Sequence, residues 1–205
     1  MPFPTTSLLD DFDRGTIGAN YSVPTLASAW GITSNQLVGS AAANVDYYNV
    51  TTYGPDCEVW ATLAVLPGAG GQVAVLLGLL DAANALTLDG YAVNYTHGAP
   101  GTIHIRRIDN GAFINLIAAT LTLTAGVQLG IRRVGLPVTG SLLTAFVNGA
   151  PVAETTEGTY TAAGYLGMSS DNTTAALDDF GGGAVRAADI DISTFPKAWA
   201  LGDRQ

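Results

Sequence analysis

The chain has 205 residues, of which 48% are apolar and 12% charged, and its formal net charge is −9. This composition excludes an intrinsically disordered chain. The pI of about 4.3 argues against nucleic-acid binding, which needs a positive field. Cys57 is the single cysteine, so an intrachain disulfide and a cysteine-rich zinc site are excluded, and we expect this thiol to be a small core residue.

The predicted elements are short strands. Turn residues recur about every 8–12 positions, which is typical of an all-β domain. In the segment 56–66, alternation places Cys57 and Val59 on one side and Trp60 on the other. The run 73–80 is apolar throughout, as in a central strand, and is far shorter than the roughly 20 residues of a membrane-spanning helix. Strands are predicted over 56–66, 72–80, 86–95, 102–108, 112–123, 127–133, 142–147, 163–168 and 174–180.

Two turns carry the strongest hairpin signal. Asn110-Gly111 and Asn148-Gly149 each lie between apolar runs, and both residue types tolerate positive φ. A weak helix is possible only over 81–85 or in the tail. The motif Leu-Asp-Asp-Phe occurs near the start, at 9–12, and near the end, at 177–180, which predicts that the first and last strands lie side by side.

The glycine triplet 181–183 predicts a flexible break after the last strand. We therefore divide the chain into a domain over 1–183 and an arm over 184–205. The arm is too apolar for a solvated tail and is expected to pack on this domain or on a neighbouring subunit. Its apolar residues are Ile190, Ile192, Phe195, Trp199 and Leu201.

The order of these strands and turns resembles a known family. The segments that carry the resemblance are an opening DDF, the pair Trp30-Gly31, EVWATL, LLGLL, LDGYAVNY, IHIRRIDNG, VQLGIRRVG, LLTAFVNGAPV, AAGYLGM and LDDFGGG. Together they resemble a concanavalin A-like lectin/glucanase domain of the laminin-G-like branch, over about residues 8–183. The resemblance implies a two-sheet antiparallel jelly-roll sandwich. Members of the family bind glycans or proteins, hydrolyse glucans or serve as structural modules, and the fold alone does not choose among these roles.

Further features look like those of a bacteriophage virion protein. These are a Met start, a first segment (1–7) without the basic and apolar regions of a signal peptide, and an apolar arm after a jelly roll. The leading interpretation is therefore a non-enzymatic structural module, either a capsid decoration or a tail or fibre component, which contacts other virion proteins and its own copies. Its expected location is the virion, or alternatively the extracellular space. No nucleic-acid or membrane partner is expected.

Glycoside hydrolysis is the least favoured alternative, because it needs a pair of carboxyl groups. The laminarinase-type members of the resembled superfamily carry Glu-X-Asp-X-(X)-Glu on one strand. The three glutamates of this chain, Glu58, Glu154 and Glu157, form no such motif. We expect Glu58 to face solvent and the segment 154–157 to be a loop. The sequence therefore predicts no enzyme.

Binding of a surface glycan is the second interpretation, because sugars are recognised by aromatic faces with a few polar groups. The candidate residues on the central strands are Trp60, Tyr91, Tyr95, His97 and His104. No cofactor is expected, apart from a possible calcium ion at Asp11 and Asp179 if the end strands pair. The two histidines have no Cys or His partners for zinc.

Overall fold

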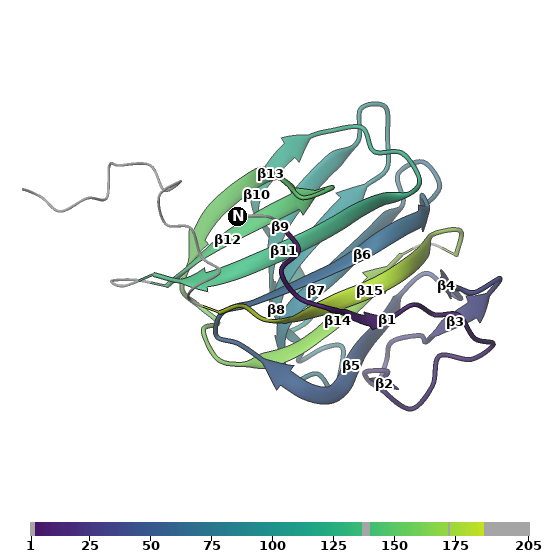
Figure 1. Ribbon diagram of the computed structural model, residues 1–205, viewed down its shortest axis with the longest axis horizontal. Coiled ribbons are helices and arrows are strands. Elements are labelled where there is room, and N and C mark those ends of the chain that lie inside the picture. Colours follow the sequence, from purple (N-terminus) through teal and green to yellow (C-terminus); the bar gives the residue numbers. More distant parts are fainter. Residues whose placement is uncertain (1–2, 137–139, 172, 187–205) are drawn as a thin grey trace, which may run out of the picture.

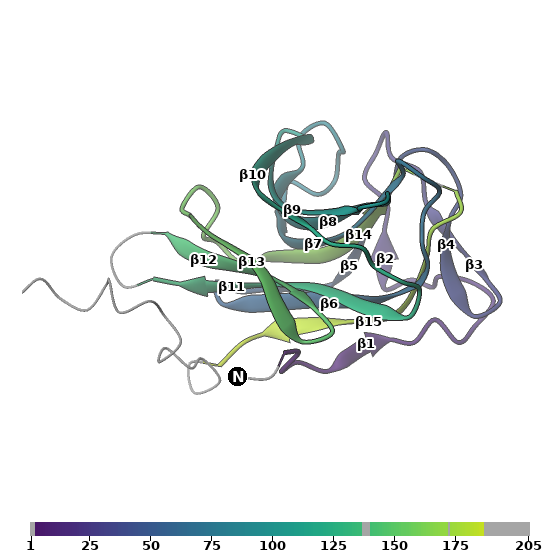
Figure 2. The same ribbon diagram turned by 90° about the horizontal axis from the view of Figure 1, so that it is seen from above.

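The computed structural model describes residues 3–136, 140–171 and 173–186. Within these ranges the chain forms fifteen strands and no helix, and the strands make two antiparallel sheets. Figures 1 and 2 show the two sheets as stacked layers. The predicted all-β, two-sheet jelly-roll sandwich is thus confirmed. No helix in the described part of the chain is suited to crossing a membrane.

The two sheets are called sheet 1 and sheet 2. Sheet 1 runs in the order β13 (Ala150–Glu157), β12 (Ser141–Val147), β11 (Val127–Gly135), β6 (Cys57–Val65), β15 (Ala176–Ala184), β4 (Gln36–Gly39) and β3 (Trp30–Thr33), and β1 (Leu8–Asp10) also pairs with β15. Sheet 2 runs in the order β10 (Ala112–Thr120), β9 (Thr102–Asp109), β8 (Asp89–Thr96), β7 (Gln72–Leu80), β14 (Gly164–Ser170), β5 (Asn44–Tyr53) and β2 (Tyr21–Ser22).

The turn predictions are confirmed where the turn residues carry a specific signal. Asn110 and Gly111 have φ of 48° and 75° and join β9 to β10, and Asn148 and Gly149 have φ of 48° and 79° and join β12 to β13. The predicted pairing of the first and last strands is also present, with Leu8 opposite Gly181. The helix considered for 81–85 is wrong, because this segment lies in a loop.

The glycine triplet is not a break. Gly181, Gly182 and Gly183 continue β15 to Ala184, and all three are buried. A Cβ on Gly181 would overlap the indole ring of Trp60, so glycine is what lets this ring approach the strand so closely. The predicted arm residues Ile190, Ile192, Phe195, Trp199 and Leu201 lie outside the described residues.

The segment 3–7 covers the outer face of sheet 1. Glu58, on β6, is fully buried beneath it: Oε1 accepts hydrogen bonds from the amides of Thr5 and Thr6 at 2.5 and 2.7 Å, and Oε2 pairs with Arg132 Nη2 at 2.6 Å. The expectation that Glu58 faces solvent is therefore wrong. Strand alternation does point this side chain away from the core, but the N-terminal segment removes it from water.

The outer face of sheet 2 is half covered by residues 81–88, here called the cross-face loop. Ala82 and Leu88 of this loop pack on Leu76, Ala92 and Ile108 of the sheet. Its backbone is held on both sides, because the Ala85 amide donates to the Thr25 carbonyl at 3.0 Å and the Gly111 amide donates to the Leu88 carbonyl at 2.8 Å. The other half of this face stays open.

Gly111 is expected to be essential for this anchoring. A Cβ at Gly111 would overlap the Ala85 carbonyl oxygen, and the residue also has positive φ. We expect Gly111→Ala to lower the free energy of unfolding by about 2–3 kcal/mol in urea titrations. Gly70→Ala is the matched control: it has φ of 80° with nothing within 4 Å of the added Cβ, so only the backbone strain of about 1 kcal/mol applies. Equal losses in both variants would contradict the steric contact.

One edge of sheet 2 is open. Among the described residues, β10 forms backbone pairs with β9 alone, and its residues are mostly exposed. The strand carries no charged residue, and Phe113, Ile114 and Ile117 are exposed on it. Figure 2 shows β10 curling out of the plane of β9 and β8.

Candidate functional site

A hollow of about 270 Å³ lies on the open half of the outer face of sheet 2. It is lined by the segments 42–45 and 169–171 and by Gln72, Asn94, Arg106 and Phe113. The strand register explains this set. Asn94 pairs with Ala74, and Arg106 pairs with Ala92, so these polar side chains share the face of two alanines that point away from the main core.

Arg106 is the centre of the polar lining. Its Nε donates to Asn115 Oδ1 at 2.7 Å, and its Nη1 donates to Gln72 Oε1 at 2.8 Å. Its guanidinium carbon lies 5.9 Å from the centroid of the Phe113 ring, whose residue is 41% exposed. The hollow therefore combines an exposed aromatic ring, a cation and amide groups.

His104 lies next to the hollow, on the same face of β9 as Arg106 and opposite Asn94 of β8. Burial and the neighbouring Arg106 lower the pKa of His104, so its imidazole is neutral at neutral pH. Its buried Nδ1 has no hydrogen-bond partner in the described part of the chain. Of the five residues predicted for glycan binding, this is the one on the open half of the face.

His104 does not itself line the hollow, and the other four predicted residues lie farther from it or in the core. Tyr91 and Tyr95 are fully buried between the sheets. His97 follows β8 and its Nδ1 lies 2.6 Å from the Pro67 carbonyl oxygen. Trp60 belongs to sheet 1 and packs with Phe3 and Phe146 under the N-terminal segment. The structure therefore does not bring these four side chains to one surface.

Sequence reasoning missed Asn94, Arg106 and Phe113. The signal for Asn94 and Arg106 was strand alternation: Tyr91, Val93 and Tyr95 share one face of β8, which leaves Asn94 on the opposite face. An aromatic residue flanked by apolar residues at every second position marks the buried face of a strand. The polar residue between two such aromatics is thus the better candidate for the outer face of the sheet, where Asn94 lies at the wall of the hollow although it is itself buried.

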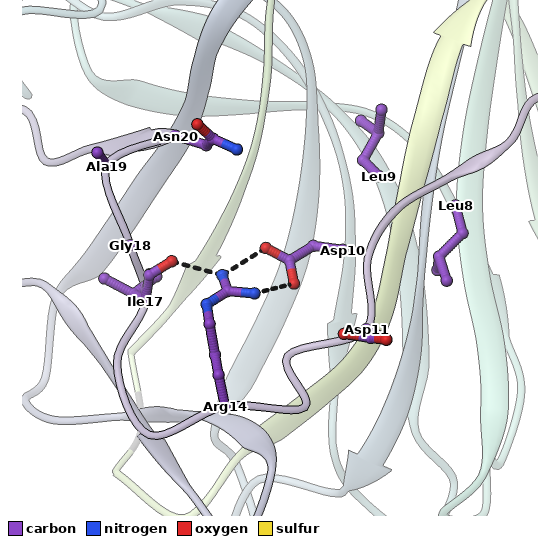
Figure 3. A pocket seen from close by; sticks show the side chains of 9 residues that line it. All are labelled: Leu8, Leu9, Asp10, Asp11, Arg14, Ile17, Gly18, Ala19 and Asn20. Atoms are coloured by element: carbon purple, nitrogen blue, oxygen red, sulfur yellow. Dashed lines mark hydrogen bonds and ion pairs between the residues drawn. The ribbon is translucent and has the colours of Figure 1, made fainter.

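A second hollow, of about 450 Å³, is formed by residues 8–11, 14 and 17–20 (Figure 3). Arg14 spans it, with Nη1 and Nη2 each 2.5 Å from a carboxylate oxygen of Asp10 and Nε donating to the Thr16 carbonyl. Burial opposes ionisation of Asp10, but the hydrogen bonds from Arg14 and the Phe12 amide lower its pKa overall. No aromatic residue lines this hollow, and Arg14 is occupied by contacts within the chain, so its role is to hold the loop 11–20.

The three glutamates are each engaged by other groups in the described part of the chain. Glu58 is sealed under the N-terminal segment, and Glu154 accepts a hydrogen bond from Thr144. Glu157 pairs with Arg107 at 3.1 Å, and hydrogen bonds from Tyr91 and Thr159 outweigh burial to lower its pKa. The segment 154–157, expected to be a loop, belongs to β13. Asp171 is the one acidic residue among those that line the hollow of sheet 2.

Asp178, the chain neighbour of the calcium candidate Asp179, is affected by the charges of other acids. Burial raises the pKa of Asp178, and the neighbouring charges of Asp179, Asp11 and Asp13 raise it further. Among the described residues, however, no group of three or more acidic, histidine or cysteine side chains is placed to hold a metal ion. A calcium site at Asp11 and Asp179 stays a prediction.

No protein-family model matches the sequence, and no curated protein matches it as a relative. Solved structures do match. The carbohydrate-binding module CBM66 from Bacillus subtilis is similar with a TM-score of 0.60 and 12% identity, over 82% of this chain and 98% of that one. The carbohydrate recognition domain of Emp47p gives a TM-score of 0.61 and 10% identity over 90% and 97%.

A glucanase has the same architecture. A prokaryotic β-1,3-1,4-glucanase (lichenase) derived from a mouse hindgut metagenome gives a TM-score of 0.56 and 11% identity, over 85% of this chain and 97% of that one. At these identities the likeness concerns the fold. The chain therefore has the concanavalin A-like jelly-roll fold found in lectin and glucanase domains.

Proposed function

We propose that this protein is a non-enzymatic carbohydrate-binding module and that its ligand occupies the hollow on sheet 2. The observation that carries the proposal is the lining of this hollow, where the exposed Phe113 ring stands beside Asn94, Gln72 and Arg106. Sugar rings present apolar C–H faces to an aromatic ring and hydroxyls to amides. A shallow site with one aromatic surface and a few convergent polar groups suits such a ligand.

The structural neighbours support this interpretation over the virion role. Two of the three described above are named for carbohydrate binding or recognition, and none is named as a virion protein. The apolar arm on which the virion interpretation depended lies outside the described residues. Among the described residues that line the hollow, Asp171 is the one acidic residue, which favours binding over hydrolysis.

The test is binding to a panel of soluble polysaccharides, measured by affinity electrophoresis and then by calorimetry. We expect at least one polysaccharide to bind, and Phe113→Ala and Asn94→Ala each to weaken that binding about tenfold or more, since truncating a central contact typically costs over 1 kcal/mol. Val50→Ala is the control, because Val50 is 56% exposed and does not line the hollow. Unchanged binding in both hollow variants would refute the assignment of the site.

A further inference from the structure

We infer that the ligand bound in the hollow of sheet 2 is an acidic sugar and that Arg106 binds its carboxylate. The inference rests on the proposed function, because it names the class of carbohydrate for the same site. Three observations support it: the unused donors of Arg106, the contrast with the other arginines, and the place of this side chain in the hollow.

The donors of Arg106 are only partly used. A guanidinium has five N–H donors. Arg106 uses one on Asn115 and one on Gln72, so three remain without an acceptor in the described part of the chain. Both acceptors are neutral amide oxygens. The two hydrogen bonds and the Phe113 ring thus orient the guanidinium without neutralising its charge.

Four other arginines in the described part of the chain are buried or partly buried, and their guanidinium groups have partners of a different kind. Arg14, Arg107 and Arg132 each pair with a carboxylate, at 2.5, 2.7 and 2.6 Å. Arg133 is fully buried and donates to three backbone carbonyls. Arg106 forms no ion pair among the described residues and also lines a hollow. Among these five arginines of the described part of the chain, it is the one that presents an unpaired charge to a hollow.

A carboxylate is the group that fits this cation. The planar guanidinium matches a carboxylate with two parallel N–H···O contacts, and such charge-assisted bonds are stronger than bonds between neutral groups. Arg106 is partly buried, and the neighbouring protein screens its charge less than open solvent does. A uronic acid presents its carboxylate at the edge of a pyranose ring, so the ring face remains free for Phe113.

Asp171 limits the strength of this interaction. It also lines the hollow, and its Oδ1 accepts a hydrogen bond from the backbone N–H of Gln72 at 2.6 Å. Its charge acts on Arg106 without forming an ion pair with it. An asparagine at this position would keep an oxygen for the Gln72 amide while removing a negative charge that opposes an anionic ligand.

The experiment compares matched pairs of ligands that differ in the carboxylate. The probes are oligogalacturonate with its methyl ester, and cello-oligosaccharide with its C6-carboxylated form, measured by calorimetry at low and high salt. We expect the acid of at least one pair to bind about tenfold or more tightly than its neutral partner. Added salt is expected to reduce this preference.

Two variants and a control assign the effect to Arg106. Arg106→Gln is expected to bind the acid no better than the neutral partner, and Asp171→Asn to bind the acid severalfold more tightly than the wild type. Arg186→Gln removes the same charge from an exposed residue outside the hollow and is expected to leave the preference unchanged. Circular dichroism checks each fold. If Arg106→Gln does not fold, the affinity of Asp171→Asn for the acidic ligand tests the assignment instead.

The outcomes separate this inference from the proposed function. If neutral sugars bind through Phe113 and the acids bind equally or worse, the acidic class is wrong and carbohydrate binding stands. If the preference for acid survives in Arg106→Gln, or if Asp171→Asn does not strengthen it, the assignment to Arg106 is wrong. If no carbohydrate binds at all, both proposals fail.

Discussion

We expect replacement of Arg133 by methionine to lower the free energy of unfolding by about 3–5 kcal/mol, because it leaves three backbone carbonyls without their donor. The Arg133 side chain is fully buried, and it donates from Nε to the Pro55 carbonyl at 2.6 Å, from Nη1 to the Tyr160 carbonyl at 3.0 Å and from Nη2 to the Ala162 carbonyl at 2.8 Å. Methionine leaves these three acceptors without their donor, and each buried unpaired group costs about 1–3 kcal/mol. Urea denaturation followed by intrinsic fluorescence measures the change.

The control for this substitution is Arg186→Met, because Arg186 is exposed. It is expected to change the stability by less than about 0.5 kcal/mol. Glycine at positions 54 and 78 belongs to the same arrangement, since an added Cβ would come within 2.7 Å of Nη2 or 2.8 Å of Nη1 of Arg133. A loss below about 1 kcal/mol in Arg133→Met would show that this side chain does not hold the end of the sandwich together.

Because of Asp46, we expect the free energy of unfolding to fall as the pH rises from about 4 to about 7. The residue is fully buried on β5, and neither carboxylate oxygen accepts a hydrogen bond of normal geometry from the described residues. Burial raises the pKa of Asp46 to about 7 from 3.8, against a smaller opposing effect of the Trp30 backbone. Between about pH 4 and pH 7 the unfolded chain therefore loses this proton while the folded chain keeps it. Stability present at low pH is lost over that window, by about 4 kcal/mol in total.

The test is the difference in stability between Asp46→Asn and the wild type from pH 3.5 to pH 8. The other acids titrate alike in both proteins, so the difference isolates Asp46. We expect it to be constant below about pH 4, to move in favour of the variant up to about pH 7 and to level off above. Asp81→Asn, which removes an exposed carboxylate, is measured alongside as the matched control. A flat difference for Asp46→Asn would mean that this carboxyl group is solvated.

The strands and turns were predictable where the local sequence is specific for one backbone conformation. The central strands have near-continuous apolar runs, and Asn-Gly turns have few alternatives in a hairpin. The strands before residue 56 were not predicted individually. β1 to β4 are short and obtain their pairing from distant partners such as β15. β5 is longer, but its second half is polar and largely exposed, so it lacks the apolar run that marks the central strands. Tertiary contacts also determine the conformation of the cross-face loop. Its apolar side chains pack on the sheet, but its backbone forms no regular secondary structure that the sequence pattern could predict.

The candidate site was less predictable than the fold. Aromatic residues were the natural candidates for a sugar, yet Tyr91 and Tyr95 belong to the core and Trp60 to the opposite sheet. The aromatic residue that lines the hollow, Phe113, is on an edge strand whose apolar sequence resembles a buried one. Its exposure depends on the position of β10 at the end of sheet 2, and strand order is a property of the whole fold that no local pattern encodes.

The open edge of β10 has a consequence for the behaviour of the protein in concentrated solution. Among the described residues no strand pairs with the outer edge of β10, and an uncharged edge strand is a template on which a strand of another molecule can form. The negative charge of −9 repels one copy from another at neutral pH. High ionic strength screens this repulsion, and acidification toward pH 4.3 abolishes it. Solubility is therefore lowest in mildly acidic, salty buffers.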